Sequence, residues 1–177
     1  MNLDDLSKLN EELTFELFNE LKEKEVIKLN DKINSINNNN EYKEIIVVYY
    51  GNPKAQPRAR ANTNFSFFYD SGKSFKQEVL EQIMNILPKN FKPIDTEVHI
   101  EANFYKQTPK SFNKIDTILA EMKLITNNKK PDNDNYLKAI QDALNGKLYT
   151  DDAIITRTSI NKYYSCKPRV ELVIKYL

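Results

Sequence analysis

The chain has 177 residues, which is enough for one domain of ordinary size with an appendage and too few for two typical independent cores. Lysine and arginine total 26 against 25 aspartate and glutamate, so the net charge of +1 excludes a whole-molecule field that would attract DNA, an anionic membrane or an acidic substrate. Hydrophobic residues make up 40% and charged residues 29%, which argues against a largely disordered or fibrous chain.

Membrane insertion and export are not expected from this sequence. Its apolar runs, such as 45–48, are far shorter than the roughly 20 residues that span a bilayer. Asp4 and Asp5 stand where a signal peptide would carry basic residues. The lone cysteine, Cys166, cannot form an internal disulfide and fits a reducing compartment. We therefore expect a cytoplasmic protein without a membrane partner.

The charge is divided unevenly along the chain. Residues 1–44 hold 11 acidic and 6 basic side chains, a net of −5, which leaves +6 for residues 45–177. Leucines recur in the acidic part at steps of three and four, which predicts an amphipathic helix over 6–21. A second stripe at 29–36 runs into four asparagines, 37–40, that favour turns and predict a linker. The acidic segment could stabilise a dimer, pack on the body, or bind a partner.

Residues 45–177 predict one α/β domain. We expect strands at 45–50, 65–69 and 97–104, helices at 75–87, 115–122 and 136–144, and a C-terminal antiparallel hairpin of strands 153–163 and 168–176. A basic loop at 53–60 follows the first strand. The fold class is therefore α/β (α+β): a small mixed, mostly antiparallel sheet with two or three helices and an N-terminal helical extension.

Acidic and basic residues concentrate after residue 128. Pro131 disfavours helix at the residue before it, so Asp132 and Asp134 are expected on an extended approach to a helix that begins at Asn135, with carboxylates about 6 to 7 Å apart. Such a pair can hold Mg²⁺, which prefers oxygen ligands and keeps water or substrate phosphate. Lys138 would lie one turn beyond Asp134 and meet that phosphate.

A second pair of carboxylates, Asp151 and Asp152, follows that helix. Alternation along the next strand would direct only one of them toward Asp132 and Asp134. On spacing alone a plain structural role is also open: the first two aspartates would cap the helix, the second two would form a turn, and Lys138 would be a solvated charge.

Together these motifs resemble the signature of the RusA family of Holliday junction resolvases. The matching segments are Lys130-Pro131-Asp132-x-Asp134-Asn135-x-x-Lys138, Asp142-Ala143-Leu144-x-Gly146, Tyr149-x-Asp151-Asp152, Gly51-x-Pro53 and Pro57-Arg58-x-Arg60. The resemblance covers roughly residues 45–177. It implies a homodimeric, Mg²⁺-dependent endonuclease, with Mn²⁺ as a substitute, that resolves four-way DNA junctions by paired cuts in recombination and repair. It assigns metal binding to Asp132, Asp134 and Asp152 and an essential role to Lys138.

Basic residues around these motifs are the expected DNA contacts: Lys54, Arg58, Arg60, Lys129 and Lys130. The aromatic residues at 65–69 could stack on unpaired bases, although core packing is the simpler role, and a packed structural role is expected for His99. Two other functions stay open. One is a non-catalytic binder of branched DNA with a structural metal, and the other is a metal-dependent enzyme acting on small nucleotides.

Overall fold

A computed structural model describes residues 11–12, 14–39, 41–56 and 73–177. The chain divides into two compact units, Met1–Glu41 and Tyr42–Leu177, which are described separately. The predicted strand over 65–69 lies outside the described residues. Among the described residues, no helix combines the length and the apolar character that crossing a bilayer requires.

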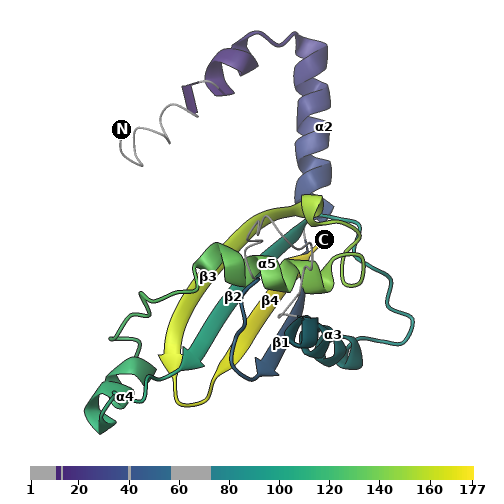
Figure 1. Cartoon of the computed structure of the whole chain (residues 1–177). Coiled ribbons are helices and arrows are strands. Elements are labelled where there is room, and N and C mark those ends of the chain that lie inside the picture. Colours follow the sequence, from purple (N-terminus) through teal and green to yellow (C-terminus); the bar gives the residue numbers. More distant parts are fainter. Residues whose placement is uncertain (1–10, 13, 40, 57–72) are drawn as a thin grey trace, which may run out of the picture. The chain divides into compact units, whose positions relative to one another are not determined.

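The first unit is helical where it is described. Residues 14–19 are helical, and helix α2 spans Glu23–Asn39 (Figure 1). The asparagine run was predicted to be a linker, but α2 continues through its first three residues. A mid-range helix propensity costs asparagine only a few tenths of a kcal/mol per residue, which a 17-residue helix can absorb. Large apolar side chains of this unit are exposed, among them Phe15, Leu17 and Ile27.

The second unit contains a four-stranded sheet in the order β1-β4-β2-β3 (Figure 1). The strands are β1 Lys43–Tyr50, β2 Val98–Gln107, β3 Ile155–Ser165 and β4 Arg169–Tyr176. Strand β4 pairs antiparallel with both β1 and β2, and β2 pairs parallel with β3. The predicted mixed, mostly antiparallel sheet is therefore confirmed.

The predicted C-terminal hairpin is wrong, because β3 and β4 are not neighbours. Strand β2 lies between them, and only residues 166–168 connect them across its end, where the Thr108 amide donates to the Ser165 carbonyl at 3.1 Å. A short polar connection predicted adjacent strands, but alternation in a sequence fixes which face a side chain takes and not which strand lies beside it. The lone cysteine, Cys166, is exposed in this connection.

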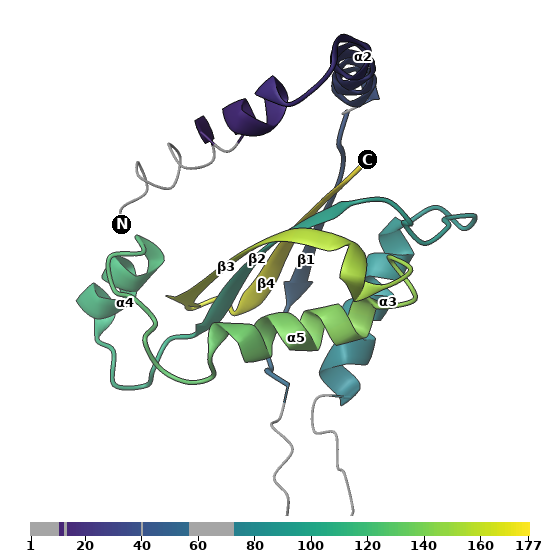
Figure 2. The same ribbon diagram turned by 90° about the horizontal axis from the view of Figure 1, so that it is seen from above.

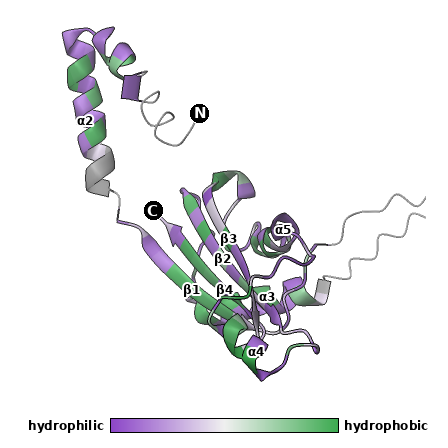
Figure 3. Ribbon diagram, turned by 90° about the vertical axis from the view of Figure 1, so that its left-hand side faces the viewer, coloured by the Kyte–Doolittle hydropathy of each residue, from purple (hydrophilic) through white to green (hydrophobic). Residues whose placement is uncertain are grey.

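Two helices cover one face of the sheet. Figures 2 and 3 show α3 (Lys73–Ile86) and α5 (Asn133–Leu144) on the same side, whereas α4 (Lys114–Glu121) lies near the ends of β2 and β3. The core lies between these helices and the sheet and includes Phe75, Val79, Ile83, Tyr136, Ile140, Leu144, Val47, Ile100, Phe104 and Leu172. The alternation along each strand places the apolar side chains against the helices.

The topology brings three strand ends to one edge. Because β1 and β2 are both antiparallel to β4, and β3 is parallel to β2, the carboxyl ends of β1, β2 and β3 share that edge. The loop after β1 reaches α5 there, since the backbone amide of Gln56 donates to the backbone carbonyl of Asn135 at 2.9 Å. The amino end of α5 therefore meets the strand ends and the start of the basic loop.

Candidate active site

Two predicted site residues, Asp132 and Asp134, stand at the amino end of α5. Asp132 is the N-cap residue with extended backbone (φ −76°, ψ 156°), and Asp134 lies in the first helical turn. Both are exposed. The helix was expected to begin at Asn135, with both aspartates before it, but it begins two residues earlier at Asn133. Asp132 fills the capping position, yet its side chain makes no capping hydrogen bond, which argues against a purely helix-capping role.

Basic residues surround the same edge. Lys129 and Lys130 are exposed directly before the Pro131-Asp132 pair, and Lys54 is exposed two residues before Gln56. The Lys54 ammonium donates to the Ser74 hydroxyl at 3.5 Å. The other predicted DNA contacts, Arg58 and Arg60, and the aromatic residues at 65–69 lie outside the described residues.

Lys138 lies one turn along α5 from Asp134 and has an ionic partner. Its ammonium is 3.5 Å from Asp142 Oδ1, while Lys76 of α3 is 3.3 Å from Asp142 Oδ2. The Lys138 side chain is 62% exposed, so this i,i+4 pair leaves its ammonium in contact with solvent. Asp142 therefore lies between Lys76 and Lys138, and the exposed Lys138 can turn toward an incoming phosphate.

Asp151 and Asp152 differ in what their side chains do. Asp151 caps a short 3₁₀ helix, Asp152–Ile154, by accepting the Ala153 amide at 2.8 Å. Asp152 is exposed within that turn. The carboxylate of Asp151 is thus engaged in local structure, whereas Asp152 faces solvent.

Asp152 lies at the opposite end of α5 from Asp132. Strand β3 begins at Ile155, and Lys162 of the same strand contacts the Pro131 carbonyl at 3.0 Å. Seven residues of strand span about 23 Å, so the start of β3 is far from the Asp132 segment. In agreement, no group of three or more acidic, histidine or cysteine side chains that could hold a metal occurs in the described part of the chain. Within one chain the described residues do not bring Asp152 to Asp132 and Asp134, and the role of Asp152 as a metal ligand stays a prediction.

Tyr149 fixes the segment that leads to Asp152. Its side chain is fully buried, and its hydroxyl donates to the Gln141 carbonyl at 3.1 Å. Burial raises the pKa of Tyr149, and the negative charges of Asp152 and Asp142 raise this pKa further. Both carboxylates therefore act on the same phenol near the carboxyl half of α5.

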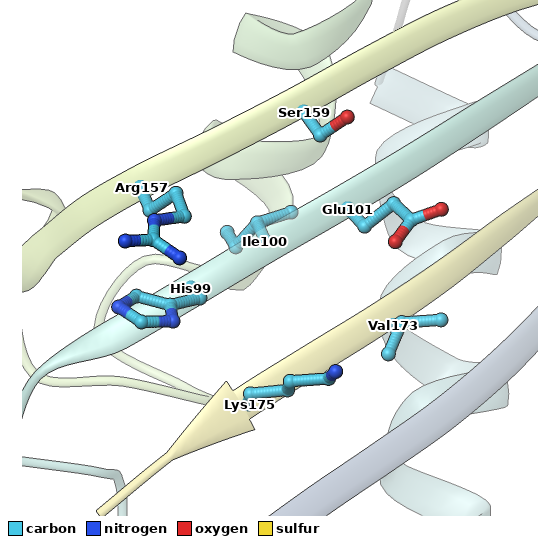
Figure 4. Close-up of a pocket in the computed structure, with 7 residues that line it drawn as sticks. All are labelled: His99, Ile100, Glu101, Arg157, Ser159, Val173 and Lys175. Atoms are coloured by element: carbon cyan, nitrogen blue, oxygen red, sulfur yellow. The ribbon is translucent and has the colours of Figure 1, made fainter. Parts of the chain in front are cut away.

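The opposite face of the sheet carries a separate cavity of about 210 Å³ (Figure 4). Arg157, His99 and Lys175 line it from β3, β2 and β4 in one row of paired residues. His99 Nε2 is 3.0 Å from Glu97 Oε1, and hydrogen bonds from Thr156, His99 and Tyr42 hold the pKa of Glu97 below its usual range. His99 thus belongs to a polar network on this face and not to the core, and it lies away from Asp132 and Asp134.

Comparison with known proteins identifies the family. A family model described as endodeoxyribonuclease RusA matches residues 50–175, which is well over half of the chain. The chain belongs to the RusA family. It is also 36% identical over 132 residues to the uncharacterized protein YqaN of Bacillus subtilis (strain 168), a match that covers 71% of this chain and 92% of YqaN. The resemblance inferred from the motifs is therefore confirmed, and RusA membership implies an endodeoxyribonuclease, a hydrolase of DNA.

RusA-family resolvases generally depend on a divalent metal, and the amino end of α5 has suitable donors. Asp132 and Asp134 offer exposed carboxylate oxygens, the hard ligands that Mg²⁺ prefers. Mg²⁺ is commonly held by only one or two protein carboxylates together with water and substrate phosphate. The pair fits such an ion, although within one chain Asp152, in the turn before β3, lies too far away to complete the set.

Sequence reasoning missed two lysines beside this candidate site. Lys162 of β3 and Lys106 of β2 donate to backbone carbonyls of the segment 129–131. A signal for one of them was present: along β3, Lys162 occupies the helix-facing row together with Ile160 and Tyr164. A lysine in such a row needs a polar partner for its ammonium, which is a signal that a loop carbonyl or carboxylate lies nearby.

Proposed function

We propose that this protein is a Mg²⁺-dependent endonuclease that cuts four-way DNA junctions. The observation that carries the proposal is the exposed pair Asp132 and Asp134 at the amino end of α5, with Lys138 one turn away, in a chain of the RusA family. A divalent ion held there would supply charge neutralisation at the scissile phosphate and activation of water. No covalent nucleophile is needed for such a hydrolysis.

Chain residues supply the remaining electrostatics of the proposed reaction. Lys138 binds the scissile phosphate and stabilises its developing charge after exchanging its contact with Asp142. Lys54, Lys129 and Lys130 contact phosphates of the junction arms, as Arg58 and Arg60 are also proposed to do. Each such contact makes DNA binding more sensitive to salt.

We also propose a homodimer whose two-fold symmetry matches that of a junction. Because Asp152 lies at the far end of α5, Asp152 of one subunit would complete the carboxylate set of the other subunit. Two such sites would make paired cuts in opposite strands.

The substitution Asp134→Asn tests the catalytic proposal. With Mg²⁺ and a synthetic four-way junction, we expect the variant to cut at least about 100-fold more slowly than the wild type, because one carboxylate of the site is lost. Junction binding in EDTA is expected to be retained, because phosphate contacts carry it. The control is Asp95→Asn, which changes an exposed loop aspartate and should cut normally.

Other outcomes would support a different function. A wild-type protein that binds junctions but cuts no branched DNA with Mg²⁺ or Mn²⁺ would be a non-catalytic binder. A protein that hydrolyses mononucleotides as readily as junctions would be a nucleotide-processing enzyme.

A further inference from the structure

Three consecutive backbone carbonyls immediately before Asp132 accept hydrogen bonds from lysine ammonium groups. Lys162 donates to the carbonyl of Lys129 at 2.8 Å and to that of Pro131 at 3.0 Å. Lys106 donates to the intervening carbonyl of Lys130 at 3.1 Å. Hydrogen bonds from a charged donor are stronger than those between neutral groups, so these three bonds hold the segment 129–131 firmly.

The two lysines come from the helix-facing side of the sheet. Lys162 pairs in register with Phe104, and Lys106 pairs with Tyr164, and both of these aromatic partners are buried. A lysine in such a row keeps its stem against apolar surface while its ammonium reaches polar partners. Here the partners are loop carbonyls, which accounts for lysines at positions that otherwise take core residues.

A third residue attaches the start of the same segment to β3. Asn127 is only 4% exposed, its amide group donates to the Tyr163 carbonyl at 3.3 Å, and its Oδ1 accepts the Lys129 amide at 3.3 Å. The backbone from 127 to 131 is thus attached at both ends to the edge strand β3 and between them to β2. Asp132 follows directly, with its own side chain exposed.

We propose that Lys162, assisted by Lys106, is a positioning residue for the metal-binding carboxylates. By holding the 129–131 carbonyls, it sets the direction in which the backbone enters α5 and therefore the places of Asp132 and Asp134. Mg²⁺ requires near-ideal octahedral geometry, so a loosened segment would hold it less tightly. This inference rests on the proposed function for its metal, but the attachment of the loop can be measured without metal.

The competing role for Lys162 is direct contact with DNA phosphate. Two of the three donors of its ammonium are already used by carbonyls at 2.8 and 3.0 Å. The two roles predict different losses. A positioning residue affects metal affinity and loop mobility, whereas a phosphate contact affects DNA affinity in the absence of metal.

The experiment compares Lys162→Met, Lys162→Arg, Lys106→Met and the control Lys175→Met in the full chain. Lys175 lies on the outer face of β4, 3.6 Å from Glu44. Hydrogen exchange of peptides covering 124–136 is measured without metal, Mn²⁺ affinity by calorimetry, and junction affinity in EDTA. For Lys162→Met we expect about tenfold faster exchange and about tenfold weaker Mn²⁺ binding, with unchanged junction affinity. Lys106→Met should change the exchange rate and the Mn²⁺ affinity in the same directions but by less. Lys162→Arg should be closer to wild type in both quantities than Lys162→Met.

Each outcome decides the proposal. Exchange and Mn²⁺ affinity equal to wild type in Lys162→Met would overturn it, and so would weaker junction binding in EDTA with unchanged Mn²⁺ affinity. If the wild type binds no Mn²⁺, the proposed function fails, and the exchange rates alone then decide whether Lys162 holds the loop. If Lys162→Met does not fold, Lys106→Met carries the same comparison.

Discussion

Two fully buried tyrosines differ in whether the hydroxyl has a partner. Tyr149 donates to the Gln141 carbonyl, whereas the hydroxyl of Tyr136, whose ring stacks on Phe104 at 4.9 Å, has no hydrogen-bond partner in the described structure. We expect Tyr136→Phe to raise the free energy of unfolding by about 1 kcal/mol, because an unpaired buried hydroxyl is removed. Tyr149→Phe should lower the free energy of unfolding by about 1 kcal/mol, because the hydrogen bond to the Gln141 backbone carbonyl is lost.

Urea unfolding at pH 7 measures both changes against the wild type. The two variants control for each other, since each removes one oxygen atom from a buried ring in the same core. A loss of stability in Tyr136→Phe would mean that its hydroxyl has a partner after all.

For individual residues, the sequence predicted the charged side chains of the candidate site but not the contacts that these side chains make. The spacing supported a metal and phosphate site, because an extended backbone would place Asp132 and Asp134 on one side and helix periodicity places Lys138 one turn beyond Asp134. The partners of Asp142 and Lys162 could not be predicted, since they join α3 to α5 and β3 to a loop across gaps of 66 and about 30 positions. Such contacts depend on tertiary packing.

Helix α4 is attached to the β3–β4 connection by one glutamate. Glu121 accepts the Cys166 amide at 2.6 Å and the Ser165 hydroxyl at 3.0 Å. Burial raises the pKa of Glu121, but these hydrogen bonds and the charge of Arg169 outweigh burial, so the net shift is downward from 4.5. A carboxyl whose pKa is lower in the folded state stabilises the fold above its unfolded pKa, and this contribution is lost as the pH falls through the folded value.

We therefore expect Glu121→Gln to lower the free energy of unfolding at pH 7 by about 1 kcal/mol, a modest value because the side chain is largely solvated. The difference from wild type should shrink as the pH falls below 4.5. Urea unfolding at pH 7 and pH 3.5 measures it, with Glu41→Gln as a control at an exposed glutamate. A difference that is equal at both pH values would exclude an ionised Glu121 as its source.

The types of the helices and strands were predicted better than the order of the strands in the sheet. The periodic stripes of α3 and α5, the β-branched and aromatic run of β1 and the alternation of β3 and β4 predicted the types of these elements correctly. The adjacency of β3 and β4 was wrong, because β4 forms its pairs with β1 and β2, which lie far earlier in the chain. Local pattern carries no information about such distant pairing.

The placement of carboxylates near both ends of α5 leads to a prediction for the proposed dimer. If Asp152 serves the other subunit, then mixing Asp134→Asn with Asp152→Asn under subunit exchange creates heterodimers with one intact site and one doubly altered site. We expect each variant alone to be inactive on a four-way junction and the mixture to nick it, to about a quarter of wild-type site content under random exchange.

Sites built within a single chain give another result. Every chain in the mixture would then lack one carboxylate, so the mixture would stay as inactive as its components. The measurement is junction nicking after mixing, with solution mass confirming that dimers are present.

The central position of β4 bears on how the domain forms during synthesis. Strand β4 is the last element of the domain in chain order, yet it alone joins β1 to β2 in the sheet. Until it emerges from the ribosome, β1 has no described strand partner and is not joined to the paired strands β2 and β3. In the nascent chain, the loop after β1, with Lys54, is therefore expected to reach its place beside the amino end of α5 only after β4 has been translated.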